Sequence, residues 1–412
     1  MSNRYHPKWF VAVSVAVALT WGCAGEDGGE VASGPEVRDS AGVRIVTYPD
    51  GAFTDTVPPE PLLTIGREGE ENYEFFRLNT VVSLASGNVV VANGGTHELR
   101  FFTPEGEHIR TVGRRGEGPG EFGFLSAVWV RAGDTLMVRD ARRRRIVVFD
   151  SAGSLVRGAS YAGDLPTESP RAQGPCAFPG LMGVLADGTR VISGWGCMML
   201  EGSAGRRPTL LPITLVGAGS GIGLGESAGG WEVDVGEFTA NRVWETGSSS
   251  DPRDLYRRIP FSGVLAWAVA PDAIHLADLE DYEIRVYEGR GRLSRILRED
   301  AEPPPVTAAH REAYLAEQEA LDRPHPEGVP FPDRFGSYET FVVSHEGDLW
   351  ARRVTPPEVE GAKWEVFPGD GGPLRRVILP DITVESVRDG RVYGHRSDSL
   401  GIQTVVVLDA GG

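Results

Sequence analysis

The apolar residues of this chain occur in short runs, and a turn containing glycine closes most of them. Four such runs follow one another between residues 81 and 112: Val81–Leu84, Val89–Ala92, Leu99–Phe102 and His108–Val112. No run is long enough for a helix of ordinary length, and glycine supplies the positive φ that tight hairpins need. The pattern therefore predicts four consecutive antiparallel strands.

The same pattern returns 47 residues later without a gap. Thr64–Arg67 corresponds to Thr111–Arg114. Later positions correspond in the same way: Glu74 with Glu121, Phe75 with Phe122, Val81 with Val128, Phe102 with Phe149 and Gly106 with Gly153. A period of this length is typical of solenoids and propellers, and four strands in each repeat indicate a propeller blade.

The turn between the first and second strands of the unit recurs six times along the chain. Its copies are 86–88, 132–134, 187–189, 271–273, 346–348 and 389–391. The copy at 271–273 lacks the glycine but lies between two apolar runs. Six copies predict six blades.

The two ends of the repeat region indicate a closed ring. The chain ends on a third strand, Val405–Leu408, and Asp39–Val46 is similar to Asp150–Val156, a turn followed by a fourth strand. We therefore expect Val43–Val46 to supply the outer strand of the last blade, which would leave no blade unpaired. The expected fold is an all-β, six-bladed β-propeller with four-stranded blades over residues 39–412.

Two insertions interrupt the period, at about 194–260 and 299–337. The first is rich in Gly and Ser. The second contains a helical pattern that begins after Thr307 and ends before Pro324. Insertions of this kind usually project from one face of a repeat array, often the binding face.

Residues 1–22 have the pattern of an export signal. A short basic start precedes an apolar run over Trp9–Trp21. This run is shorter than the roughly 20 residues of a membrane-spanning helix and fits the roughly 7–15 of a signal peptide. Cys23 follows, and the small and acidic residues up to 38 predict a flexible tether.

The junction at Cys23 resembles the lipobox of bacterial lipoproteins, which implies cleavage before this cysteine and acylation of it. Leu19 lies four residues before Cys23 instead of three, and Trp21 is bulky for its position. Secretion with cleavage nearby is the alternative. The resemblance implies a lipid-anchored protein of the cell envelope, and Ala24 favours the outer membrane or periplasmic side.

The linker Gly113-x-x-Gly116-Glu117-Gly118-Pro119-Gly120-Glu121-Phe122, together with the blade pattern, resembles six-bladed β-propellers of the NHL type and their bacterial lipoprotein relatives. The resemblance covers about residues 39–409. It implies the fold, but relatives include scaffolds, ligand binders, lactonases and lyases, so it does not imply one chemistry.

The formal net charge of −17 argues against nucleic acid as a partner, because such a chain repels phosphate backbones. One basic segment stands out, and it could dock an anionic lipid, a polysaccharide or an acidic partner. It consists of Arg142, Arg143, Arg144 and Arg145. A solvated loop is the simpler interpretation.

A candidate metal site comes from three equivalent positions just after the second strand. Asn93, Asp140 and Asp278 offer hard oxygen ligands of the kind that Ca²⁺ prefers, and lactonase-like relatives use Ca²⁺. The alternative is that each side chain caps a turn between strands two and three. We favour turn caps, since only two of the six blades have a carboxylate there.

Cys176 and Cys197 are the remaining cysteines, and both have glycine close by. In an oxidising compartment they could form one disulfide. Two reduced, buried thiols are the alternative, and no histidine nearby indicates a metal site.

No reactive constellation stands out in the sequence. It therefore favours a non-enzymatic binding or scaffold module in the cell envelope, without a cofactor, whose ligand is a protein, a peptide or a glycan. The alternative is a Ca²⁺-dependent hydrolase or lyase of the lactonase type, with its site at the mouth of the propeller channel.

Overall fold

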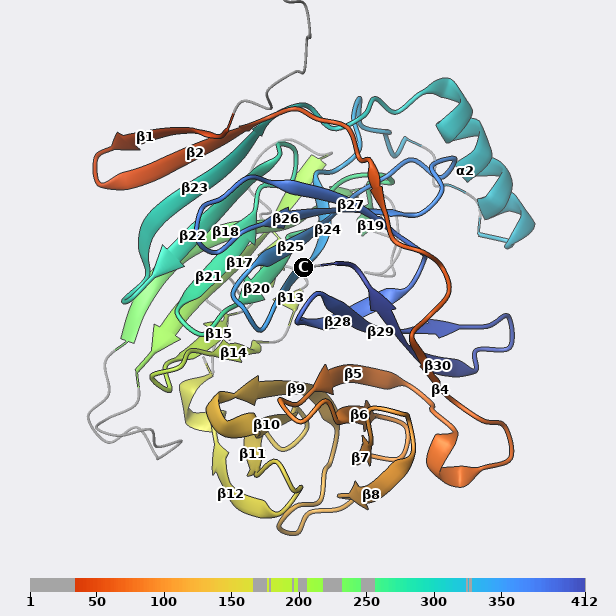
Figure 1. The fold of residues 1–412 in the computed structure, drawn as a ribbon. Helices are drawn as coiled ribbons and strands as arrows, with labels where there is room; N and C mark the ends of the chain where they lie inside the picture. Colours follow the sequence, from red (N-terminus) through yellow and green to blue (C-terminus); the bar gives the residue numbers. More distant parts are fainter. Residues whose placement is uncertain are drawn as a thin grey trace, which may run out of the picture. The chain divides into compact units, whose positions relative to one another are not determined.

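The computed structural model describes residues 34–165, 176–177, 179–194, 196–198, 206–217, 232–245, 256–323, 325 and 328–411 (Figure 1). The predicted signal peptide, Cys23 and the predicted tether as far as residue 33 lie outside these residues. Within the described part, no helix is long and apolar enough to cross a membrane.

The first two repeats form two four-stranded antiparallel sheets, as predicted. The first blade consists of β5 (Leu78–Ser83), β6 (Val89–Asn93), β7 (Glu98–Phe102) and β8 (His108–Val112). The second consists of β9 (Leu125–Arg131), β10 (Thr135–Asp140), β11 (Arg145–Phe149) and β12 (Leu155–Ser160). Val81 lies opposite Val91 and, 47 residues later, Val128 lies opposite Val138, so the repeat extends to the strand register.

Blades four to six have the same strand order, and each begins with its inner strand (Figure 1). The fourth is β20 (Trp267–Val269), β21 (Ala273–Ala277), β22 (Glu283–Glu288) and β23 (Arg292–Asp300). The fifth is β24 (Tyr338–Val343), β25 (Leu349–Arg353), β26 (Ala362–Phe367) and β27 (Arg375–Leu379). The sixth takes β28 (Thr383–Arg388), β29 (Arg391–Ser397) and β30 (Gln403–Asp409) from the end of the chain.

The described residues of the first insertion form long strands of the third blade. Its sheet contains β14 (Gly180–Val184), β15 (Arg190–Ser193), β17 (Arg206–Val216) and β18 (Glu232–Glu245). Three short strands extend it: β13 (Cys176–Ala177), β16 (Gly196–Met198) and β19 (Tyr256–Arg258). β17 pairs with β15 through one end and with β16 through the other, so the hairpin of β17 and β18 continues beyond the blade.

An N-terminal strand closes the last blade, as predicted, but it is a different strand from the one expected. β4 (Leu63–Ile65) pairs with β30 and completes the sixth sheet. The expected segment lies in β2 (Val43–Pro49), which pairs in parallel with β23 of the fourth blade. Ala41 and Gly42 form the turn of a hairpin between β1 (Glu36–Ser40) and β2, so residues 36–38 are a strand rather than tether.

Between these two pairings, β3 (Asp55–Thr56) pairs in parallel with β27 of the fifth blade. The N-terminal segment thus adds strands to the outer edges of blades four, five and six in turn (Figure 1). The repeat pattern already contained the correct closing strand, because Thr64–Arg67 corresponds to Thr111–Arg114 at the end of β8.

The core formed by the described residues consists of six apolar clusters, and each joins two neighbouring blades. One cluster joins blade six to blade one, with Val405 and Val407 packed against Val81 and Phe102. The other five join blades one to two, two to three, three to four, four to five and five to six. Together they complete the ring, and the protein is a six-bladed β-propeller.

The second insertion contains the predicted helix, α2 (Ala308–Ala320). Thr307 accepts a hydrogen bond from the His310 amide at 3.3 Å, while His310 Nδ1 accepts one from the Thr307 amide at 3.0 Å, which forms a reciprocal cap. Single turns of 3-10 helix occur at Glu71–Tyr73, Ala132–Asp134 and Ala162–Asp164.

Candidate functional site

The structure uses Asn93 and Asp140 to fix the linkers between blades. Asn93 Oδ1 accepts a hydrogen bond from the Phe76 amide at 2.9 Å. Asp140 accepts hydrogen bonds from the amides of Gly123 and Phe124, both at 3.0 Å. The amides of Phe76 and Gly123 are 47 residues apart in the sequence. The side chains of Asn93 and Asp140 therefore hold equivalent linkers in successive blades.

Asp278 caps a turn of the fourth blade. Its Oδ1 accepts hydrogen bonds from the amides of Glu280 at 2.9 Å and Asp281 at 3.3 Å. No group of three or more His, Cys, Asp or Glu side chains that could hold a metal ion occurs among the described residues. Asp278 caps the turn between strands two and three of its blade, and Asp140 also accepts a hydrogen bond from the Arg143 amide of the corresponding turn at 3.2 Å. Asn93 instead bonds to the backbone of Phe76 and Glu74 in the linker before its blade, so the calcium site stays a prediction.

The basic segment 142–145 divides into two inward and two outward side chains. Arg143 forms an ion pair with Glu117. Arg145 donates to Asp140 at 3.3 Å and to the Glu121 carbonyl at 2.5 Å. Arg142 and Arg144 are exposed, so only these two are available for a partner.

Cys176 and Cys197 lie directly opposite each other, on β13 and β16. Their side chains fall outside the described residues. The predicted disulfide therefore stays a prediction, with a backbone register that places the two residues side by side.

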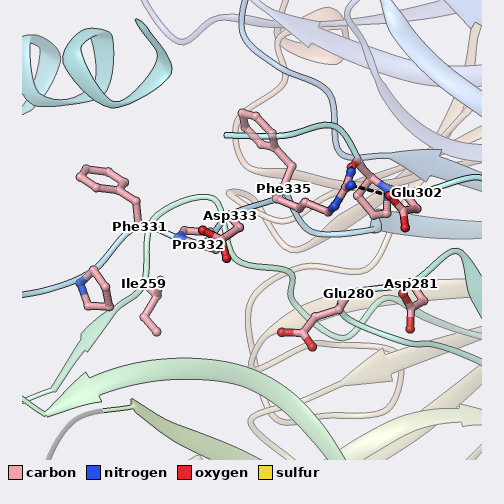
Figure 2. A pocket seen from close by; sticks show the side chains of 11 residues that line it. Ile259, Glu280, Asp281, Glu302, Phe331, Pro332, Asp333 and Phe335 are labelled. Atoms are coloured by element: carbon pink, nitrogen blue, oxygen red, sulfur yellow. Dashed lines mark hydrogen bonds and ion pairs between the residues drawn. The ribbon is translucent and has the colours of Figure 1, made fainter. Parts of the chain in front are cut away.

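A pocket of about 480 Å³ lies beside the helical insertion (Figure 2). Four separate segments line it. They are the stretch after β19, the loop between β21 and β22, the stretch after β23 and the stretch after α2. Its side chains include Ile259, Glu280, Asp281, Glu302, Phe331, Asp333, Arg334 and Phe335.

The pocket is acidic. Its lining holds four carboxylates and one guanidinium, which belongs to Arg334. Glu302 forms an ion pair with Arg334, and Glu280 forms one with Arg242 of β18. The carboxylates of Asp281 and Asp333 make no ion pair or hydrogen bond with other described residues. Two uncompensated negative charges therefore face the pocket.

Backbone pairing makes one wall of the pocket rigid. The Val306 amide donates to the Asp333 carbonyl at 2.8 Å, and the Phe335 amide donates to the Pro304 carbonyl at 3.0 Å. These bonds tie the two proline-containing ends of the second insertion together, and proline restricts the backbone further. Phe335 is buried, 5.1 Å from the His310 ring.

A second pocket of about 370 Å³ lies between β18 and the fourth blade. Asp278 lines this second pocket, together with Arg285, Phe238 and Tyr287. Arg285 donates to Glu283 at 2.9 Å and lies 3.9 Å from Asp278. Glu237 is a second carboxylate of the lining, so this pocket is also acidic.

Two buried carboxylates at the joint between blades four and five were not predicted. Tyr338 donates to Glu365 at 2.9 Å, and Arg353 donates to Glu365 at 2.8 Å. Burial and the neighbouring Glu299 raise the pKa of Glu365 to about 8. Burial also acts to raise the pKa of Glu299, but hydrogen bonding with Glu365 and the Arg353 and Arg376 charges lower it on balance.

A carboxylate and an imidazole lie close together in the sixth blade. Glu385 is the extra residue of a bulge in the inner strand β28, and its carboxylate lies 3.5 Å from His395 Nδ1. Burial raises the pKa of Glu385 to about 8 and lowers the pKa of His395. Both are therefore mostly uncharged near neutral pH.

The sequence missed these residues for different reasons. The pocket carboxylates lie in four segments far apart in the chain, and the only signal was the pair of insertions. Glu365 and Glu385 lie inside strands. A charged residue within an apolar strand pattern could have indicated a buried carboxylate there.

Comparison with known proteins supports the fold. A family model described as a 6-bladed beta-propeller matches residues 68–162, which span the first two blades. No curated protein matches the chain.

Solved structures of other propellers resemble the chain weakly. One is a Bacteroides fragilis protein assigned as exported, with 10% identity, a TM-score of 0.44 and coverage of 88% of this chain and 99% of that one. Regucalcin, a calcium-binding protein from Agrobacterium tumefaciens, has 14% identity, a TM-score of 0.33 and coverage of 88% and 96%. Virginiamycin B lyase from Staphylococcus aureus has 8% identity, a TM-score of 0.37 and coverage of 84% and 98%.

Proposed function

We propose that this β-propeller is an exported, lipid-anchored binding module of the cell envelope, and that the acidic pocket beside α2 binds a positively charged peptide segment of a partner protein. The observation that carries the proposal is the charge imbalance of that pocket. Four carboxylates line it against one guanidinium, and two of them have no partner among the described residues.

The pocket offers a basic side chain more than charge. Pro330 and Pro332, both half-buried, can pack against the aliphatic stem of lysine or arginine, whose charged end would reach Asp281 or Asp333. The half-buried ring of Phe331 can stack with a guanidinium. The volume of about 480 Å³ falls within the usual range of roughly 300–1,000 Å³ for ligand sites.

A binding role fits the lining better than catalysis. The pocket has no imidazole, thiol or hydroxyl side chain that could act as a nucleophile or a base near neutral pH. The alternative of a Ca²⁺-dependent hydrolase would need converging carboxylates, and Asn93, Asp140 and Asp278 are each used by their own blade.

The test is binding of an oligolysine peptide to the full chain, measured by calorimetry at low and moderate salt. The double variant Asp281→Asn/Asp333→Asn should weaken binding about tenfold, since two exposed ion pairs contribute together roughly 1–2 kcal/mol. Asp272→Asn/Glu105→Gln is the matched control, because it removes the same two charges at exposed positions that do not line the pocket. Equal losses in both variants, or no saturable binding, would contradict the proposal.

The anchor is tested separately from the pocket. We expect acyl chains on Cys23 in protein extracted from membranes, detected by mass spectrometry of the N-terminal peptide. Cys23→Ser should move the protein to the soluble fraction. A Cys23→Ser variant that stays in the membrane fraction would argue against the anchor while leaving the pocket proposal intact.

A further inference from the structure

A small cavity of about 120 Å³ lies between the N-terminal strand β2, the fourth blade and the turns of the fifth blade. It is separate from the acidic pocket and shares no lining residue with it. The charge of its lining is mainly positive, unlike that of the acidic pocket. Its polar side chains include Arg44, Tyr48, His275 and Arg295.

The two arginines lie directly side by side. Arg44 and Arg295 are register partners in the parallel pairing of β2 with β23 (Figure 1). Val46 and Leu297, two residues further along each strand, line the same cavity, so both arginines lie on the face that borders it. Like charges directly opposite each other destabilise a sheet unless an anion lies between them.

Neither arginine has a close ion pair within the protein. Arg44 makes no ion pair or hydrogen bond with the described residues, although Asp39 of β1 is its register partner on the other side of β2. Arg295 has one long contact, 3.4 Å to Glu288, and its buried Nε has no hydrogen-bond partner. The rim contains one carboxylate, Asp370, whose Oδ1 already accepts a hydrogen bond from the Gly372 amide at 2.9 Å.

Two further polar side chains of the cavity, those of His275 and Tyr48, make no hydrogen bond with the described residues. His275 is 6% exposed, and neither ring nitrogen bonds to a described residue. Burial, together with the Arg295 charge, lowers the pKa of His275 to about 3, so the neutral ring keeps one N–H donor. Tyr48 is 2% exposed, and its hydroxyl makes no hydrogen bond within the described part of the chain.

We propose that this cavity binds a small carboxylate. Two guanidinium groups, an imidazole N–H and a phenol O–H surround one space, and an oxyanion would supply the acceptors that these donors lack. Leu297, Leu349 and Phe367 give the cavity an apolar wall for a short alkyl group, which favours a carboxylate over phosphate. The bound anion would also hold β2 against the fourth and fifth blades.

The experiment titrates the full chain with propionate, inorganic phosphate and chloride at constant ionic strength. Calorimetry measures binding, and the melting temperature reports stabilisation. Propionate should bind saturably and raise the melting temperature, and phosphate and chloride should not reproduce this. Arg44→Gln should weaken propionate binding at least tenfold. It should also raise the melting temperature of the ligand-free protein, because it removes the repulsion with Arg295.

Arg292→Gln is the matched control. Arg292 is exposed on β23 and does not line the cavity. The variant removes the same charge as Arg44→Gln. Propionate binding should be unchanged in it. An equal loss in both variants would reveal a general effect of net charge, and tighter binding of phosphate than of propionate would overturn the choice of ligand. The absence of saturable binding by any of the three anions would overturn the site.

Discussion

The hydroxyl of Tyr338 donates a hydrogen bond of 2.9 Å to Glu365, a carboxylate with no exposed surface. This pair lies where blades four and five meet, and Arg353 connects it to Glu299 at the end of β23. Arg376 of β27 then donates to Glu299 at 2.6 Å and to the Pro49 carbonyl at 2.6 Å. A buried polar network therefore joins the inner strand β24 to the N-terminal strand β2.

Removing one donor from this network should destabilise the protein. Tyr338→Phe leaves the ring in place but deprives Glu365 of a hydrogen bond, which typically costs about 1.5–3 kcal/mol for a charged partner and less for a protonated one. Chemical denaturation measures the change. Tyr393→Phe is the control, because Tyr393 is buried and its hydroxyl bonds to no described residue. A similar loss in both variants would show that the network adds little.

Glu385 should make stability fall as pH rises. Its pKa in the folded protein is about 8 against an ordinary value of 4.5, so the folded state holds a proton that the unfolded state releases between these values. The favourable contribution is complete below about pH 4.5 and is lost as pH rises through about 8. Glu385→Gln should flatten this dependence by the order of a few kcal/mol. Denaturation at several pH values measures it, and an unchanged slope would refute the burial argument.

The two N-terminal pairings should differ in importance. A chain that lacks residues 34–49 loses β1 and β2 but keeps β4, so we expect a folded but less stable propeller. A chain that lacks residues 34–66 loses the outer strand of blade six and should not unfold cooperatively. Within the full chain, Ile65→Ala should cost about 2–5 kcal/mol, because Ile65 is 1% exposed. Circular dichroism and thermal melting distinguish these outcomes. Cooperative folding of the shorter chain would contradict the assigned closure.

The cross-strand register of Cys176 and Cys197 makes the predicted disulfide testable. Peptide mapping without reductant should recover the two cysteines in one linked fragment of the exported protein. Replacing both by serine should cost about 3 kcal/mol, the contribution expected for a loop of roughly 20 residues. Free thiols in the exported protein would exclude the bond.

The sequence alone determined the blade, its strand order and the number of blades. Strands within a blade pair through short turns, so the period of 47 residues and residues such as Gly87 and Gly106 record local pairing directly. The helical insertion was equally local, because its cap joins Thr307 to a residue three positions away.

Only the tertiary structure decided which N-terminal strand closes the ring and where the pockets lie. Val43–Val46 and Leu63–Ile65 are both short apolar segments, and either can pair with an exposed sheet edge. The choice depends on the route of the chain around blades four, five and six. The same reason applies to Arg44 and Arg295, which are 251 residues apart in sequence and adjacent in a sheet. Spacing along a chain carries no record of such pairs, because long-range packing brings them together.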